Sequence, residues 1–249
     1  MQLRFHFHGD LTFFLTAGSR QRPVARSLHE KTSVKDAIEA WGVPHTEVDL
    51  ILCDGSPVRF SHQLTGNTEI NVYSPSGSPQ EFAGNRLQER GITKFVADGH
   101  LGKLARYMRL FGFDVVYKAM ADDAALLELS RREKRALLTR DRRLLMHAVV
   151  RHGYCPRSDF PEEQTVEVIR RFDLQAVLAP FSRCLVCNAA LERVKKTDVL
   201  DRLEPLTKIY YQDFRRCILC GKIYWPGSHF GKLQSRIRRI RNAVESQIN

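Results

Sequence analysis

The chain has 249 residues, of which 43% are hydrophobic and 27% charged, and its formal net charge is +11. This composition is typical of a globular protein, and no apolar run approaches the roughly 18–20 residues that a membrane-spanning helix needs. Residues 1–11 alternate apolar and polar side chains, without the apolar centre of a secretory signal peptide. We therefore expect a cytoplasmic protein with one large domain or two to three small ones.

The positive charge is unevenly distributed along the chain. Residues 1–78 hold 7 Lys and Arg against 8 Asp and Glu, a net charge of −1; the remaining 32 and 20 give residues 79–249 a net charge of +12. A strongly basic part is expected to face an acidic partner, and nucleic acid is the first candidate. A protein that is basic without such a partner is the alternative.

Residues 1–73 have the pattern of a small α+β domain. Leu3, Phe5 and Phe7 alternate with polar residues, as in a half-buried strand. A turn is expected at Asp54-Gly55, and a helix capped by Thr32 or Ser33 is expected to stop near Gly42. Further strands are predicted at Pro23–Leu28, Val48–Leu52, Val58–Phe60 and Glu69–Tyr73. The resulting β-β-α-β-β order is the ubiquitin-like β-grasp layout.

The segments LCDGSPVRF and NTEINVYSP within this domain resemble the sulfur-carrier branch of the β-grasp fold. Those carriers are activated at a free Gly-Gly carboxyl terminus, whereas this chain continues through a Ser-, Pro- and Gly-rich stretch. We therefore expect a module that docks a protein partner and does not carry sulfur.

A parallel α/β unit is predicted between Thr93 and Asp141. Its strands are expected at Phe95–Ala97, Asp114–Tyr117 and Ala136–Thr139, with helices from Leu101 to Gly112 and from Asp123 to Lys134. The first helix has an apolar face, and its opposite face carries Lys103, Arg106 and Arg109. Further helices are expected at 144–150, 159–172 and in the basic tail.

Acidic residues at strand and helix ends of this unit predict a divalent-cation site. Asp98 and Asp141 follow two of the strands, where ligands bind in such sheets, and Asp122 and Asp123 open the second helix. Mg²⁺ or Mn²⁺ prefers carboxylate oxygens, lowers the pKa of bound water and stabilises both reacting oxygens of a phosphodiester. The structural alternatives are a helix cap for Asp122 and polar turns for Asp98 and Asp141.

Basic side chains close to these acids are candidate contacts to RNA phosphates. A solvated helix face is the alternative for those on the first helix. The candidates are Lys103, Arg106, Arg140, Arg142 and Arg143.

Four of the six cysteines form two Cys-x-x-Cys pairs. They are Cys184 and Cys187, followed by Cys217 and Cys220. This spacing is typical of a four-thiolate structural Zn²⁺ site of the zinc-ribbon type, with its ligand shell closed to substrate. An iron–sulfur or redox role is the alternative. Tyr224 and Trp225 follow the second pair and either stack on bases or complete the core of the ribbon.

Three segments together resemble the Mut-seven-type carboxy-terminal RNase domain. They are FVADGHLGKLARYMRLFGFDVVY, DDAALLELSRREKRALLTRDRRLL and the later cysteine block. That family is assigned to the PIN-like nucleases and is often fused to an amino-terminal ubiquitin-like domain. The closing segment fits as well, although a tryptophan is usual where this chain has Phe230.

The resemblance implies a metal-dependent ribonuclease with Asp98 as its first acid and Asp141 as the acid after a Thr-Arg dipeptide. Asp122 and Asp123 compete for the intermediate acid. PIN nucleases generally use a fourth acid, for which Asp159 and Glu128 are candidates.

These observations lead to a prediction for the whole chain. We expect a β-grasp domain at 1–76, a linker at 77–92, a PIN-like α/β parallel-sheet nuclease domain at 93–178, a zinc ribbon at 179–232 and a basic helix at 233–249. The expected function is hydrolysis of RNA phosphodiester bonds. The alternative is a non-catalytic RNA- or ribosome-binding protein with a nuclease-like fold. A phospho-receiver fits less well, because its acidic pair normally follows the first strand.

Overall fold

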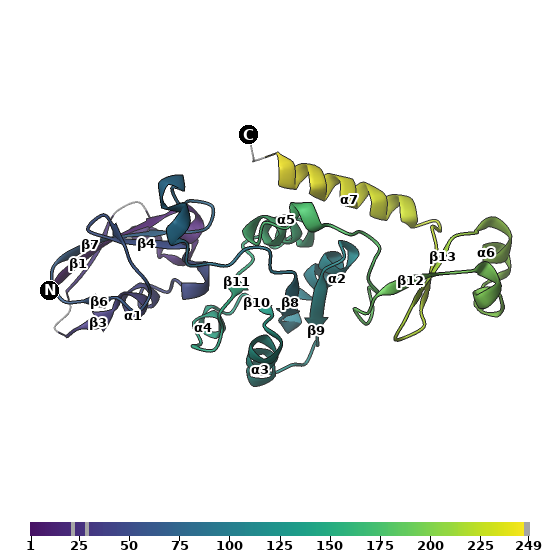
Figure 1. Ribbon diagram of the computed structural model, residues 1–249, viewed down its shortest axis with the longest axis horizontal. Helices are drawn as coiled ribbons and strands as arrows, with labels where there is room; N and C mark the ends of the chain where they lie inside the picture. The colour runs from purple at the N-terminus through teal and green to yellow at the C-terminus, as the bar shows by residue number, and fades with distance from the viewer. Residues whose placement is uncertain (21–22, 28–29, 247–249) are drawn as a thin grey trace. The chain divides into compact units, whose positions relative to one another are not determined.

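The computed structural model describes residues 1–20, 23–27 and 30–246 (Figure 1). The chain folds into two compact units, neither of which is continuous in sequence. The first comprises Met1–Arg90 and Asp122–Arg157, and the second comprises Gly91–Ala121 and Ser158–Asn249. Leu28, the last residue of the predicted second strand, lies outside the described residues.

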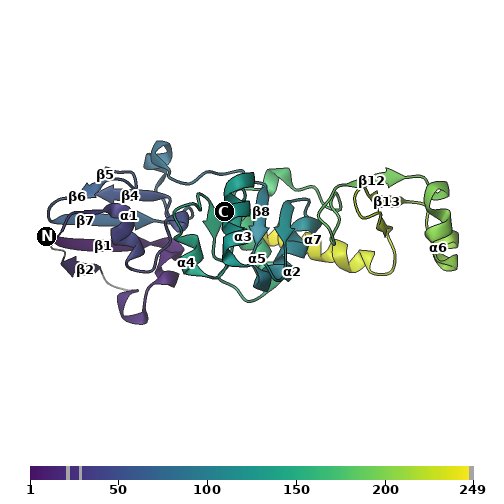
Figure 2. The ribbon, with the colours of Figure 1, turned by 90° about the horizontal axis from the view of Figure 1, so that it is seen from below.

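A five-stranded sheet forms the amino-terminal part of the first unit (Figure 2). Its order is β2-β1-β7-β4-β5, and β1 pairs with β7 in parallel and with β2 in antiparallel orientation, which is the predicted β-grasp layout. Leu3, Phe5 and Ile70 are fully or almost fully buried in it. The elements are β1 Gln2–His8, β2 Val24–Ser27, β3 Thr32–Ser33, α1 Val34–Glu39, β4 Leu50–Cys53, β5 Ser56–Pro57, β6 Gln63–Leu64 and β7 Thr68–Tyr73.

Local signals in this part of the chain act as expected. The Ser33 hydroxyl caps α1 by accepting a hydrogen bond from the Asp36 N–H at 3.1 Å. Asp54 and Gly55 both have positive φ angles, 47° and 79°, as a tight hairpin between β4 and β5 requires.

The predicted strand at 58–60 is wrong, because this segment passes the start of α1 and the Phe60 carbonyl accepts a hydrogen bond from the Lys35 N–H.

The segment after the sheet is tied back to it through Asp49, which is 1% exposed. Its carboxylate accepts hydrogen bonds from Arg86 Nη1 and from the Gln88 N–H, both at 3.0 Å. Residues of the predicted linker therefore pack against the start of β4. Strand β4 begins at Leu50, two residues later than the sequence predicts.

The carboxyl-terminal part of the first unit supplies two parallel strands and two helices. Leu137 and Leu138 of β10 pair with Gly153 and Tyr154 of β11. The elements are α3 Asp123–Glu133, β10 Ala136–Leu138, α4 Arg142–Leu145 and β11 Gly153–Tyr154. The predicted helix at 144–150 is wrong beyond α4, because the chain turns there and the Val150 carbonyl accepts a hydrogen bond from His45 Nε2 at 2.8 Å.

A buried ion pair joins the two segments of the first unit. Arg157 donates to both carboxylate oxygens of Glu47, which is 1% exposed, at 3.1 Å and 2.9 Å, and to Asp10 at 3.0 Å. Glu47 also accepts the Cys155 N–H at 2.7 Å. Burial lowers the pKa of the Arg157 guanidinium, but the attraction of Glu47 outweighs it, and the net direction is upward.

Replacement of Glu47 by glutamine is expected to destabilise the protein by about 3–5 kcal/mol, because it leaves the buried Arg157 charge poorly compensated. Glu128→Gln is the matched control: Glu128 pairs with Arg131 on the exposed face of α3, and its loss should cost at most about 1 kcal/mol. Urea unfolding of both variants measures the difference. Equal midpoints for the two variants would contradict a stabilising role for the Glu47–Arg157 pair.

In the second unit, the strands β8 Lys94–Ala97 and β9 Asp114–Tyr117 pair in parallel, with Lys94 opposite Asp114 and Ala97 opposite Tyr117. Phe95 meets Phe172 of the neighbouring segment edge-on at 5.2 Å. The helices are α2 Gly102–Leu110, α5 Pro161–Arg171 and α7 Phe230–Glu245. Helix α7 runs alongside α5, where Arg236 and Arg239 of α7 pair with Glu162 (Figure 1).

The parallel pair β8–β9 in the second unit and the parallel pair β10–β11 in the first unit are the strands of the predicted PIN-like α/β fold. A separate antiparallel sheet, in the order β12-β13-β14, forms the ribbon in the second unit, around a small core of Val199, Leu203 and Phe214. The ribbon elements are β12 Leu191–Val194, α6 Pro205–Tyr210, β13 Phe214–Cys217 and β14 Ile223–Tyr224.

Candidate functional site

The four cysteines of the two Cys-x-x-Cys pairs converge on one point in the second unit. Their sulfurs all lie within 4.8 Å of one another; Cys184 Sγ is 3.7 Å from Cys220 Sγ and Cys187 Sγ is 3.3 Å from Cys217 Sγ. A tetrahedron of Zn–S bonds of about 2.3 Å requires sulfur separations of roughly 3.8 Å. The donor set and its spacing therefore fit a zinc ion.

Both cysteine pairs adopt the same backbone turn. The N–H of the second cysteine donates to the sulfur of the first, from Cys187 to Cys184 and from Cys220 to Cys217, each at 3.5 Å. The next residue has a left-handed backbone, which costs little at Gly221 because glycine lacks a Cβ. The corresponding residue of the first turn is Asn188, with φ of 74°. The two turns thus point all four sulfurs toward one another.

Two side chains fasten this site to the α/β sheet within the second unit. Arg109 of α2 is 6% exposed and donates to the carbonyls of Val115 in β9 and of Leu185 and Val186 in the first turn. Asn188 accepts the Val115 N–H at 3.0 Å and donates to Asp114 at 2.7 Å. The predicted exposed position of Arg109 is therefore wrong, because its guanidinium satisfies carbonyls that would otherwise be buried unpaired.

Tyr224 is joined to the cysteine site through its hydroxyl. Its hydroxyl lies 3.1 Å from Cys184 Sγ and accepts the Leu185 N–H at 3.2 Å. Trp225, the next residue, is 39% exposed. Of the two aromatic residues that the sequence singles out, the structure assigns one to the ribbon and leaves the other with an open face.

Asp98 lies directly after β8 and is half-buried. Its carbonyl accepts the Leu101 N–H at 2.9 Å in a short turn. A Cβ on Gly99 would lie 2.7 Å from the Ala119 carbonyl oxygen, so this position requires glycine. Tyr117 at the end of β9 donates to the Gly99 carbonyl at 2.9 Å. The loop that carries Asp98 is therefore held in place by the neighbouring strand.

Asp122 and Asp123 differ in what they do at the start of α3. Asp122 caps the helix, with Oδ1 accepting the Ala125 N–H at 2.8 Å, and Asp123 is the first helical residue. Both side chains are exposed. The capping role that the sequence offers as an alternative for Asp122 is confirmed, and Asp123 is the less committed of the two.

Asp141 caps the next helix, α4. Its Oδ1 accepts the N–H groups of Arg143 at 2.8 Å and Leu144 at 3.3 Å, and its own N–H donates to Thr139 at 3.0 Å. Both bonds to the carboxylate use the same oxygen, and the residue is exposed. Asp141 is thus fixed three residues beyond the last residue of β10, and its second carboxylate oxygen takes no part in the cap bonds.

The candidate RNA-binding residues fall into two groups. Lys103 and Arg106 on α2 and Arg143 on α4 are exposed, as a phosphate contact requires. Arg142 instead donates to the carbonyls of Phe14 at 2.9 Å and Phe13 at 3.5 Å, and stacks over both rings. Arg140 is exposed and donates to the Arg157 carbonyl at 3.3 Å.

The fold and the cysteine site together define a class of protein: a PIN-like α/β sheet with a cysteine ribbon, preceded by a ubiquitin-like module. Comparison with family models agrees with this class. Residues 93–237 match the Mut7-C RNAse domain, and residues 1–80 match the Mut7-C ubiquitin model. The chain belongs to the Mut7-C RNAse domain family.

Comparison with curated proteins and with solved structures found no match. Across the described residues, helices that combine the length and apolarity for a membrane crossing are absent.

Proposed function

We propose that this protein is a metal-dependent ribonuclease that hydrolyses RNA phosphodiester bonds. The observation that carries the proposal is the match of an RNase family model to residues 93–237, a range that includes all four candidate acids. Asp98 and Asp141 each follow a strand of the α/β sheet, at the carboxyl end where such sheets bind ligands.

In this proposal the carboxylates of Asp98 and Asp141 hold Mg²⁺ or Mn²⁺, with Asp122 or Asp123 as a further acid. The cation would supply a hydroxide at neutral pH and neutralise charge on the scissile phosphate. Asp123 is favoured over Asp122, because the Asp122 carboxylate already caps α3. Lys103, Arg106 and Arg143 would hold the RNA backbone electrostatically, so that binding weakens as salt rises.

The four-cysteine site is proposed to hold structural zinc. Its four thiolates would complete the coordination shell, so no position remains for water or substrate. The bound ion and its thiolates would carry a net negative charge, and the guanidinium of Arg109 lies against the first turn with the opposite charge. This zinc would set the shape of the ribbon, and the ribbon would contribute to RNA binding.

A non-catalytic RNA- or ribosome-binding protein is the second candidate. It is favoured by the capping roles of Asp122 and Asp141, and by Glu128, which is engaged with Arg131 on an exposed helix face. Neither candidate depends on the ubiquitin-like module, for which we propose a protein partner. A cytoplasmic location is part of both proposals, since cysteines that serve as metal ligands are typical of reducing compartments.

Cleavage of labelled single-stranded and structured RNA by the purified protein tests the proposal. We expect cleavage with Mn²⁺ or Mg²⁺ and none after EDTA, with recovery when either ion is added back. The zinc content of the EDTA-treated sample is measured in parallel, so that loss of the ribbon zinc is not mistaken for loss of a catalytic ion. RNA binding without any metal-dependent cleavage would overturn the nuclease and leave the RNA-binding protein.

A further inference from the structure

The second unit contains a cavity of about 480 Å³ beside the ribbon sheet. This volume lies within the range of about 300–1,000 Å³ that is usual for small-molecule sites. Its walls come from the ribbon, from the end of α2 and from the start of α7. The side chains that matter here are Phe181, Arg193, Arg215, Trp225 and Phe230.

Aromatic rings form part of this wall. Phe181 and Phe230 lie 4.9 Å apart with their planes inclined by 34°, and Trp225 lies 6.5 Å from Phe214 of the ribbon core. Trp225 is 39% exposed, so one part of the indole anchors on the core while another part stays open to a ligand. A flat, unpaired base is the kind of ligand that stacks on such rings.

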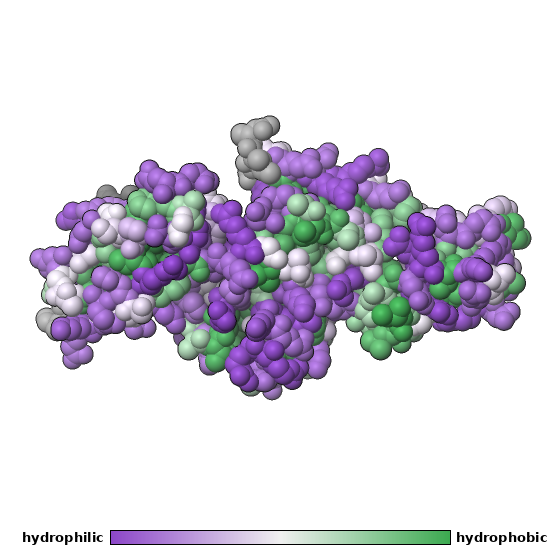
Figure 3. Space-filling model, viewed as in Figure 1, coloured by the Kyte–Doolittle hydropathy of each residue, from purple (hydrophilic) through white to green (hydrophobic). Residues whose placement is uncertain are grey.

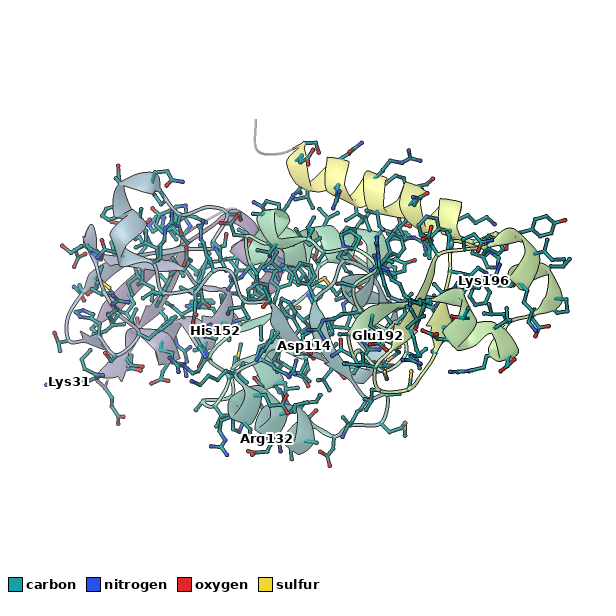
Figure 4. All side chains as sticks on the ribbon, turned by 45° about the vertical axis from the view of Figure 1, so that its right-hand side comes forward. Lys31, Asp114, Arg132, His152, Glu192 and Lys196 are labelled. Carbon is teal, nitrogen blue, oxygen red and sulfur yellow. The ribbon has the colours of Figure 1, made fainter. Side chains whose placement is uncertain are left out.

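The strand register places two like charges opposite each other beside these rings. Arg193 of β12 faces Arg215 of β13, whereas the next pair along the strands, Glu192 and Arg216, is an ion pair at 2.8 Å. Successive pairs point to opposite faces of a sheet, so Arg193 and Arg215 lie on the face opposite to that of Glu192, which is labelled in Figure 4. Directly opposed like charges are unfavourable unless an anion lies between them.

The charge of the cavity wall agrees with an anionic ligand. The charged residues of the wall are three arginines, Arg183 being the third, and one acid, Asp213. Arg183 donates to the Gly112 carbonyl and pairs with Asp114 at 3.9 Å, and Arg215 donates to the Phe181 carbonyl, so both are partly occupied. Arg193 is exposed and has no partner among the residues the structure describes. It is therefore the cation best able to bind a phosphate.

Phe181 adopts an unusual backbone conformation at this site, with φ of 61°. A bulky residue in the left-handed region carries strain, and such residues cluster at functional sites. The surroundings enforce it: the Phe181 N–H donates to the Leu110 carbonyl at 3.0 Å, and its carbonyl accepts Arg215 Nη1 at 2.6 Å. These bonds fix the ring of Phe181 against Phe230.

From these observations we propose that the cavity binds one unpaired nucleotide of RNA. Its base stacks against Trp225 and Phe230, and its phosphate lies against Arg193 and Arg215. This inference rests on the proposed function, because it takes RNA as the ligand. It goes further in assigning the strand a holding point on the ribbon, separate from the acids at the ends of β8 and β10.

Tryptophan fluorescence provides a direct test, because the chain has two tryptophans, Trp41 and Trp225. In a full-length, zinc-loaded Trp41→Phe protein the emission reports on Trp225 alone. Titration with a single-stranded RNA oligonucleotide, without added Mg²⁺ or Mn²⁺, is expected to quench this emission to saturation. An abasic oligonucleotide of the same length should bind more weakly and quench little, since it offers no base to stack.

Arg193→Ala in the same background is expected to weaken binding by about fivefold to tenfold and to reduce the slope of log affinity against log salt by about 0.7, as for one lost phosphate contact. Arg151→Ala is the matched control: Arg151 is also exposed, lies in the first unit and is not part of the cavity wall. It removes the same charge and should change affinity much less.

Labelled RNA that binds by anisotropy without any change in Trp225 emission would overturn the nucleotide site, and so would equal effects of the two arginine variants. Either result leaves the nuclease proposal intact, since that is judged by cleavage with Mn²⁺ or Mg²⁺. Absence of RNA binding would also overturn the site, and the cleavage assay would then show whether the nuclease proposal fails with it.

Discussion

Asp98→Asn and Asp141→Asn are each expected to abolish most RNA cleavage while leaving the fold unchanged. A carboxylate that holds a catalytic cation contributes several kcal/mol of transition-state stabilisation, and each 1.4 kcal/mol is about tenfold in rate. We therefore expect kcat to fall by about 10²-fold to 10³-fold or more. Single-turnover cleavage with Mn²⁺ measures the loss, with RNA binding measured separately.

Asparagine is the informative replacement at Asp141 because it keeps the helix cap. Its amide oxygen can still accept the N–H groups of Arg143 and Leu144, and asparagine caps helices about as well as aspartate. A loss of activity at constant stability then reports on the charge alone. Asp141→Ala also removes the cap. It should therefore abolish the activity and in addition lower the stability by about 1 kcal/mol.

Replacement by asparagine also distinguishes the roles of Asp122 and Asp123. Asp122→Asn keeps the cap of α3, whereas Asp123 is exposed and makes no cap bond in the described structure. If Asp123 is the intermediate acid, Asp123→Asn lowers cleavage and Asp122→Asn does not. Metal-dependent cleavage that persists in both the Asp98 and the Asp141 variants would remove these residues from the site.

Cys217→Ser is expected to release the zinc and unfold the ribbon. Cys217 is 1% exposed and is the last residue of β13, the middle strand of the ribbon sheet. Its replacement therefore removes a buried zinc ligand. Binding of structural zinc is worth about 10–16 kcal/mol in small zinc domains, which is more than such a fold retains without it. We expect loss of zinc together with rapid proteolysis between residues 184 and 224.

Elemental analysis measures the zinc content per chain, and limited trypsin digestion measures the unfolding of the ribbon. Cys53→Ser is the control: Cys53 is also buried, at the end of β4 in the first unit, and is not part of the four-cysteine group. It should keep a full complement of zinc. Full zinc content and protease resistance in Cys217→Ser would contradict a four-cysteine structural site.

Features that depend on short sequence spacing could be predicted, and those that depend on distant partners could not. Two Cys-x-x-Cys pairs determine their own turns, because the bonds that shape each turn lie within four residues. The Asp54-Gly55 hairpin follows from local backbone preferences in the same way. Helix α2 was predictable from the spacing of its buried apolar side chains.

Arg109 and Glu47 show what such patterns miss. Arg109 lies on the same helical stripe as exposed basic residues. It becomes a buried donor because it bonds the Val115 carbonyl on the next strand and two carbonyls 76 and 77 positions later. Glu47 precedes a strand and looks like a surface residue, until Arg157, 110 positions away, pairs with it. The cavity beside the ribbon could not be predicted either, because its aromatic and basic residues come from separate segments of the chain.

The discontinuity of the two units bears on how the chain acquires its structure during synthesis. The ubiquitin-like segment leaves the ribosome first, yet the arginine that neutralises Glu47 is residue 157. By the time it emerges, β8, α2 and β9 of the other unit have already been made. Until residue 157 has been made, Glu47 lacks the arginine that pairs with it in the folded first unit. The first unit therefore completes its contacts only after strands and a helix of the second unit have been synthesised, although domains generally fold as units in chain order.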